Sequence, residues 1–155
     1  MGDPKQFAKA VVREDLARYR LRIGPSRVHR FGVFALEPIP TDRKIIPYTG
    51  ELIGRRAAVR RGAGGRTYLM RINDYWLLDG SVGGSGAELI NHSCEPNCRF
   101  DIRGSEVWII SLRIIGPREE LLLDYCFSNK HPPVPCYCGA PACRGIINVK
   151  KTQLP

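Results

Sequence analysis

The sequence contains no long apolar run. None of its apolar stretches approaches the roughly 20 residues that a bilayer-spanning helix needs, and its first residues are polar and charged where a signal peptide would be apolar. We therefore expect a soluble, intracellular protein, nuclear or cytoplasmic, without a membrane partner. With 155 residues, 43% of them hydrophobic, the chain is long enough to bury one core and too short to divide into two.

Negative charge is also scarce. The 15 Asp and Glu residues are outnumbered by 24 Lys and Arg, which gives a net charge of +9. The excess is concentrated in the first thirty residues and in Arg55–Arg66. Such surfaces attract nucleic acid or another polyanion by counterion release, but charge runs are just as often solvated faces. Nucleic acid is therefore a candidate partner through these basic patches, and charge alone identifies none.

The cysteines do not follow the pattern of a disulfide framework. Half of the six lie in the short run Cys136–Cys143, and no export signal precedes them, so metal binding is the better explanation. Gly139 and Pro141 can fold this run so that three sulfurs point to one place, but structural Zn²⁺ takes four ligands in a tetrahedron. The candidates for the fourth are Cys94, Cys98, Cys126, His92 and His131. The alternative is three ordinary buried or oxidised thiols.

Short alternating segments separated by Gly and Pro predict a mainly β domain. We expect strands at Tyr19–Ile23, Val33–Ala35, Lys44–Tyr48, Tyr68–Ile72, Tyr75–Leu78, Arg99–Ile102, Val107–Ser111 and Leu121–Tyr125. Residues 4–18 have the composition of a short amphipathic helix. Arg55–Arg66 is interpreted as a surface helix that frays into a loop at Gly62–Gly65.

Two further segments carry chemistry-bearing residues. Asn91-His92-Ser93-Cys94 follows a short apolar stretch, and Asp124-Tyr125 ends an apolar strand. In isolation, the first could be a turn with a satisfied histidine, and Tyr125 could be a core residue.

Taken together with the cysteine run, these segments resemble the SET-domain lysine methyltransferases with their cysteine-rich post-SET segment. His29–Ala35 and Tyr48–Ile53 match the family as well, in the right order, and the resemblance extends from about Ser26 to Gly145. It implies a SET-domain (β-clip) fold of small sheets with a knot-like crossing near the C-terminus. The implied division is an N-terminal flank at 1–18, a SET domain at 19–130 and a zinc-bound post-SET segment at 131–155.

The resemblance also implies a function for individual residues. The activity is transfer of a methyl group from S-adenosylmethionine to a lysine of a protein or peptide, with a histone tail or another chromatin protein as the expected substrate. Tyr125 and Tyr68 act at the reacting amine, and Phe100 and Leu123 line the substrate channel. The remaining matches are Phe31, Gly32, Asn91, His92 and Tyr137 at the cofactor, and Cys94, Cys136, Cys138 and Cys143 at Zn²⁺.

The residue types suit this chemistry. Methyl transfer to an amine is an in-line displacement, so it needs alignment and a neutral lysine more than a strong base. Lysine has a reference pKa near 10.4, which desolvation and the adjacent sulfonium charge lower. The Tyr125 hydroxyl would orient the amine, Tyr137 would pack on the adenine, and Gly32 would let the backbone approach the cofactor closely.

The sequence departs from the family pattern in three places. Arg30 replaces a usual Gly, Glu88-Leu89 replace a usual Arg-Phe, and Leu123 replaces the Phe or Tyr that limits methylation. Because Leu123 has no hydroxyl to hold an ordered water, we expect dimethyl-lysine and trimethyl-lysine to be tolerated.

Two rival hypotheses remain at this stage. A catalytically weak SET-fold module could bind peptides, and a basic zinc module could bind nucleic acid. The second does not explain the Asn-His-Ser and Asp-Tyr motifs, and it should ignore S-adenosylmethionine.

Overall fold

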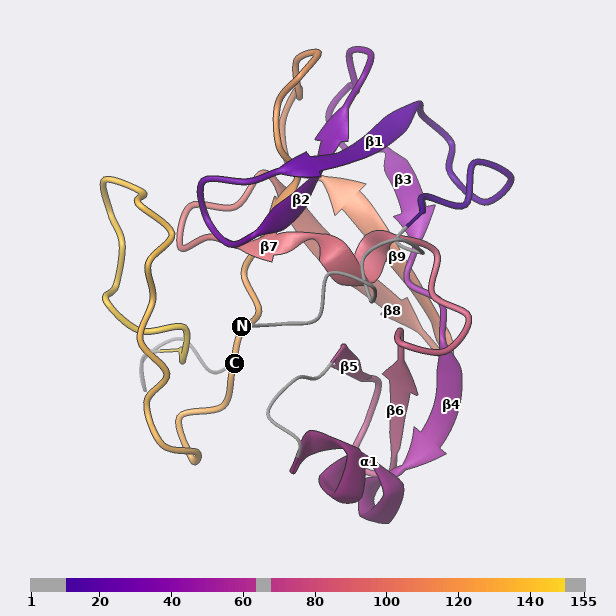
Figure 1. The fold of residues 1–155 in the computed structure, drawn as a ribbon, viewed down its shortest axis with the longest axis vertical. Coiled ribbons are helices and arrows are strands. Elements are labelled where there is room, and N and C mark those ends of the chain that lie inside the picture. Colours follow the sequence, from indigo (N-terminus) through magenta and orange to yellow (C-terminus); the bar gives the residue numbers. More distant parts are fainter. Residues whose placement is uncertain (1–10, 64–67, 150–155) are drawn as a thin grey trace.

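The computed structural model describes residues 11–63 and 68–149. This part of the chain is mainly β, as the sequence predicts, with short strands in three small sheets (Figure 1). The strands, sheet by sheet and in their hydrogen-bonded order, are β1 (Leu21–Pro25) and β2 (Phe31–Ala35); β3 (Lys44–Pro47), β9 (Glu106–Ser111), β8 (Cys98–Arg103), β10 (Leu122–Leu123) and β7 (Asn91–His92); and β4 (Glu51–Gly54), β6 (Trp76–Asp79) and β5 (Leu69–Arg71). Among these residues, no helix has the length and apolar character needed to cross a membrane.

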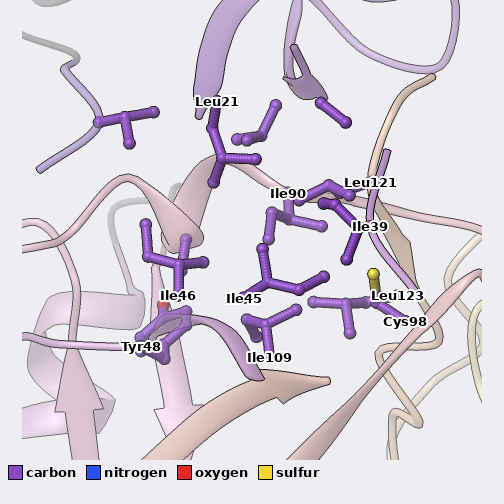
Figure 2. Packing of buried hydrophobic residues seen from close by; sticks show 14 of the residues in the cluster. Leu21, Ile39, Ile45, Ile46, Tyr48, Ile90, Cys98, Ile109, Leu121 and Leu123 are labelled. Atoms are coloured by element: carbon purple, nitrogen blue, oxygen red, sulfur yellow. The ribbon is translucent and has the colours of Figure 1, made fainter. Parts of the chain in front are cut away.

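One hydrophobic core joins the first two sheets. Strands β3, β9 and β10 contribute side chains with almost no exposure, among them Ile45, Ile109 and Leu123 (Figure 2). Strand β2 contributes Val33, which is also fully buried. Burying an aliphatic side chain stabilises the fold by roughly 1.5–3 kcal/mol, so this cluster holds the sheets together. The functional segments are built on its edges.

The last strand passes between two earlier segments. β10 pairs in parallel with β7 through Leu122 and Leu123, and Leu123 also pairs with Cys98 of β8. Asn97, which is 1% exposed, fastens the crossing: its amide donates to the Glu120 carbonyl at 2.7 Å and its Oδ1 accepts the Leu122 N–H at 2.8 Å. This is the knot-like crossing that the family resemblance implies.

The expected helix at residues 4–18 is wrong for the portion that the structure describes. Residues 11–18 contain a single turn, in which the N–H groups of Leu16 and Ala17 bond to the Arg13 carbonyl. The Arg13 N–H instead donates a hydrogen bond to the Ser85 carbonyl at 2.8 Å, and Val12 packs into the core. A second long-range backbone hydrogen bond runs from the Arg18 N–H to the Ile45 carbonyl at 2.8 Å. The packing of Val12 and these two bonds thus hold the segment where a helix was expected. Residues 4–10 lie outside the described residues.

The other expectations hold with shifted boundaries. The helix expected from Arg55 is α1 (Arg55–Gly62), and most of the loop expected at Gly62–Gly65 lies outside the described residues. The strand expected at Tyr19–Ile23 lies two residues later, because pairing with β2 sets Leu21 opposite Ala35. Two strands were not expected: β4, which pairs with β6, and β7, whose Asn-His pair had the character of a turn. A short 3-10 helix, η2 (Ala87–Leu89), leads into β7.

Candidate active site and metal centre

Four sulfurs gather where the C-terminal segment meets the core. Those of Cys94, Cys136, Cys138 and Cys143 all lie within 4.8 Å of one another, and the Sγ of Cys94 is 3.7 Å from that of Cys136 and 4.0 Å from that of Cys143. Sulfurs placed about 2.3 Å from a tetrahedral Zn²⁺ are separated by about 3.8 Å. The geometry and the all-sulfur donor set fit this metal. Cys98, Cys126 and His131 are not members of the cluster.

The pKa values of the cysteines indicate that the cluster is suited to a bound cation. Burial raises the pKa of Cys136 to about 12. Burial also acts upward on Cys138, but the N–H groups of Cys94 and Ala140 and the neighbouring thiols outweigh it and lower the pKa of Cys138 to about 6. The Cys138 thiolate is thus favoured, and ionisation of Cys136 is opposed. A bound divalent cation would allow all four to ionise.

Tyr125 lies just beyond β10 with its hydroxyl turned back onto Ile90, the residue between η2 and β7. The hydroxyl donates to the Ile90 carbonyl at 2.7 Å, and the ring packs at a tilt on His92 with 5.3 Å between centroids. Burial, with smaller contributions from Tyr68 and Glu120, raises the pKa of Tyr125 well above its usual value. The hydroxyl therefore stays protonated at neutral pH, so it can donate a hydrogen bond but cannot serve as a base.

Two other tyrosines stand close to Tyr125. Tyr68 precedes β5, and its carbonyl accepts the hydroxyl of Tyr48 at 2.5 Å and the N–H of Gly80 at 2.9 Å. Burial, followed by the charges of Glu88, Tyr125, Asp79 and Tyr68, raises the pKa of Tyr48. Tyr48 was not predicted as a site residue. Its place at the end of an apolar strand could have indicated it, because a buried tyrosine hydroxyl needs a hydrogen-bond partner.

Asn91 holds the start of β2 in place. Its Nδ2 lies 2.8 Å from the Phe31 carbonyl, 3.2 Å from the His29 carbonyl and 2.9 Å from Oε1 of Glu120. The same carboxylate accepts the Ser26 hydroxyl at 3.0 Å. Glu120 therefore organises this corner, a part that the sequence did not reveal.

Gly32 faces this carboxylate. A Cβ at Gly32 would lie 2.0 Å from Oε1 of Glu120 and 3.2 Å from Nδ2 of Asn91. Glycine is thus required at position 32 because any side chain there would collide with the Glu120 carboxylate. Its closeness to a cofactor stays a prediction.

His92 connects the cysteine cluster to the Asp-Tyr segment. Its Nδ1 accepts the Tyr125 backbone N–H at 3.1 Å, and its Nε2 lies 3.5 Å from the Cys94 sulfur. Burial, only partly offset by Asp124, lowers the pKa of His92. A neutral ring whose Nδ1 accepts must carry its proton on Nε2, so the proton points to Cys94.

The remaining predicted residues lie in two settings. Phe31 and Tyr137 are rings left 38% and 81% exposed, whereas Leu123 is 1% exposed inside the core and Phe100 is partly buried on β8. Phe127, which was not predicted, is 42% exposed with its ring 5.7 Å from that of Tyr125. It adds a second aromatic ring beside that of Tyr125.

Comparison with known proteins identifies a family model, a SET domain, that matches residues 30–126. The histone-lysine N-methyltransferase TRX1 of Oryza sativa subsp. japonica is 43% identical over 142 residues, which is 84% of this chain and 14% of that protein. An H3 lysine-4 specific histone-lysine N-methyltransferase of Schizosaccharomyces pombe is 41% identical over 140 residues, 83% of this chain and 15% of that protein. The chain thus spans about one seventh of the length of these relatives.

A solved structure is similar as well. KRYPTONITE, crystallised in complex with mCHG DNA and SAH, superposes with a TM-score of 0.70 at 30% sequence identity. The match covers 84% of this chain and 29% of that one.

Proposed function

Since the chain belongs to the SET-domain family, we propose that it is a histone-lysine N-methyltransferase that uses S-adenosylmethionine as the methyl donor. The observation that carries the proposal is the joining of Tyr125, His92 and the four-cysteine cluster at one crossing. The related methyltransferases of rice and fission yeast agree with this choice.

S-Adenosylmethionine supplies a methyl group on a sulfonium, and we assign its contacts to Asn91, His92, Phe31, Gly32 and Tyr137. Tyr137, 81% exposed, can pack its ring on an adenine, and Phe31 lies at the start of β2 with 38% exposure. The buried backbone of β7 offers polar groups at the crossing. Four cysteines, Cys94, Cys136, Cys138 and Cys143, would hold one Zn²⁺ and keep the C-terminal segment on this site.

The tyrosines act on the substrate lysine. Because Tyr125 keeps its proton, the amine must lose its own to solvent, and an aromatic channel favours that loss by desolvation. The Tyr125 hydroxyl and Tyr68 would then orient the lone pair, while carbonyls such as that of Ile90 offer weak carbon-hydrogen contacts to the methyl. Phe100 and Leu123 would line the channel.

We infer that the substrate is a histone H3 tail, with lysine 4 as the leading site. The H3 lysine-4 specificity in the name of the fission yeast relative supports it, as does the name of the Arabidopsis thaliana relative ATX1, a histone H3-lysine(4) N-trimethyltransferase that is 41% identical over 144 residues. A nuclear location follows from this substrate.

We also propose that α1 contacts nucleic acid. Arg55, Arg56 and Arg60 are exposed and form no ion pair within the described chain, whereas Arg61 bonds to Glu51 at 2.8 Å and Asp79 at 2.6 Å. A basic protein and a basic histone tail repel each other. Attraction between α1 and the DNA that carries the tail would offset this repulsion.

Cofactor binding combined with a peptide array tests the proposed function. Calorimetry should detect S-adenosylmethionine binding, and labelled cofactor should mark H3 peptides that contain lysine 4 and not those with arginine there. A protein that ignores the cofactor, or one that binds it and methylates no peptide or histone, contradicts the proposal.

A further inference from the structure

Arg144 follows the cluster residue Cys143 directly, yet its side chain is only 10% exposed. Its guanidinium donates two hydrogen bonds to the Asp124 carboxylate, at 2.6 Å and 3.0 Å, and one to the Ile147 carbonyl at 3.0 Å. Its Nε is buried without a partner in the described chain. An arginine is buried in this way only when its charge is compensated, so the Asp124 pair fixes its position.

Asp124, held by Arg144, in turn fixes the backbone around the next residue, Tyr125. Its Oδ1 also accepts the Cys126 N–H at 3.0 Å, so the carboxylate bridges the far side of Tyr125. Burial acts to raise the pKa of Asp124, but the hydrogen bonds of Arg144 and the Cys126 N–H outweigh it and lower the pKa. The carboxylate is therefore charged at neutral pH, and the backbone on both sides of Tyr125 is tied to Arg144.

A second connection runs through the metal cluster. The backbone N–H of Arg144 donates to the Cys94 sulfur at 3.4 Å, and that sulfur lies 3.5 Å from Nε2 of His92. The other nitrogen of His92 accepts the Tyr125 N–H. Arg144 thus reaches Tyr125 by two routes, one through Asp124 and one through Cys94 and His92.

We propose that Arg144 is a positioning residue that couples the zinc cluster to Tyr125; the inference rests on the proposed function. Four thiolates around one Zn²⁺ carry a net charge of minus two, and Asp124 adds another negative charge beside them. The Arg144 guanidinium and N–H contact both groups. With the arginine in place, the cluster, Asp124 and Tyr125 form one unit, and without it the carboxylate and the thiolates repel each other.

The test compares Arg144→Gln, Arg144→Lys, Asp124→Asn and the Arg144→Gln/Asp124→Asn double variant. Arg144→Gln should lower kcat about ten- to a hundredfold, because a small misplacement of a catalytic group has effects of that order. Its KM for the peptide and its Kd for S-adenosylmethionine should stay within about twofold, with one zinc per chain retained. Arg144→Lys should recover part of kcat. The double variant should be no slower than the slower single variant, because both changes remove one interaction.

Two further measurements keep the test decisive. Arg103→Gln, which removes an exposed pair with Asp101 at the end of β8, is the ion-pair control and should leave kcat unchanged. Amide hydrogen exchange should rise in residues 121–127 of Arg144→Gln and not in the control. Loss of zinc or of cofactor affinity in step with activity, or additive effects in the double variant, would overturn the coupling. If the wild-type protein transfers no methyl group while the exchange change appears, the proposed function fails and the coupling stands.

Discussion

The hydroxyl of Tyr125 donates its hydrogen bond to the carbonyl of Ile90, the residue directly before the Asn91-His92 strand. The backbone N–H of Tyr125 returns to the ring of His92 on that strand. Tyr125 is thus held at both ends by the segment that it crosses. Its orientation depends on the crossing, and the cysteine cluster joins the C-terminal segment to Cys94, two residues after His92.

The cluster predicts about one Zn²⁺ per natively purified chain. Because Cys94 belongs to the core and its partners to the C-terminal segment, removing the metal should free that segment and weaken cofactor binding. Metal analysis and cofactor titration before and after chelation measure both effects. Cys138→Ser should lose zinc, whereas Cys126→Ser, an exposed thiol outside the cluster, should keep it. A zinc-free native protein, or an affinity that survives complete metal removal, contradicts this account.

Gly32→Ala should lower the free energy of unfolding by about 1–3 kcal/mol, since the added methyl must displace the Glu120 carboxylate. Gly54→Ala is the matched control: a Cβ there meets nothing within 4 Å and φ is −82°, so the poorer N-cap of α1 and the stiffer unfolded chain oppose each other, and a net change below about 0.5 kcal/mol is expected. Urea unfolding of both variants decides the point. Equal losses at the two glycines would show that Glu120 does not set the requirement at position 32.

Leu123 is predicted to permit dimethyl-lysine and trimethyl-lysine. Leu123→Tyr should shift the product toward monomethyl-lysine, because a hydroxyl can hold the amine or a water. Since Leu123 is 1% exposed, unfolding must be measured alongside product distribution to show that the larger ring is accommodated. A wild-type protein that stops at one methyl group, or a folded variant with an unchanged product distribution, removes Leu123 from this role.

The α1 proposal predicts a change in salt dependence. Arg55, Arg56 and Arg60 changed together to Gln should weaken binding to a short DNA duplex and reduce the slope of log K against log salt by about 2.7, if each arginine meets one phosphate. Arg13, Arg20 and Arg103, each paired with a carboxylate, changed together to Gln remove the same charge as a control. Matching slopes in the two triple variants would assign any DNA binding to net charge alone. Methylation of a free peptide should not differ between them.

Local patterns in the sequence predicted part of this structure. The alternation in Val107–Ser111 and the helix at Arg55 depend on neighbours a few residues apart, and both were found close to the expected positions. The tight spacing of Cys136, Cys138 and Cys143 indicated a metal centre in the same way. The strand β7 escaped notice because two residues are too short for a period, and only pairing with β10 creates it.

Other parts depend on partners far apart in the chain. Glu120 meets Ser26 and Asn91, and Arg144 meets Asp124, across separations of 20 to 94 residues. No window of sequence contains both partners of such contacts. The same reason explains the wrong helix, since Val12 has the apolar character of a helical anchor and is used in packing a loop.

The most direct test of the account is mass spectrometry of an H3 tail peptide after incubation with S-adenosylmethionine and either the wild-type protein or Tyr125→Phe. The wild-type protein should add methyl groups at lysine 4. The variant should be slower by about a hundredfold or more, because a positioned transition-state contact is lost, while its Kd for the cofactor remains within about twofold. Full activity in Tyr125→Phe, or an unmodified peptide with a wild-type protein that binds cofactor, would contradict the claim that methyl transfer takes place at this tyrosine.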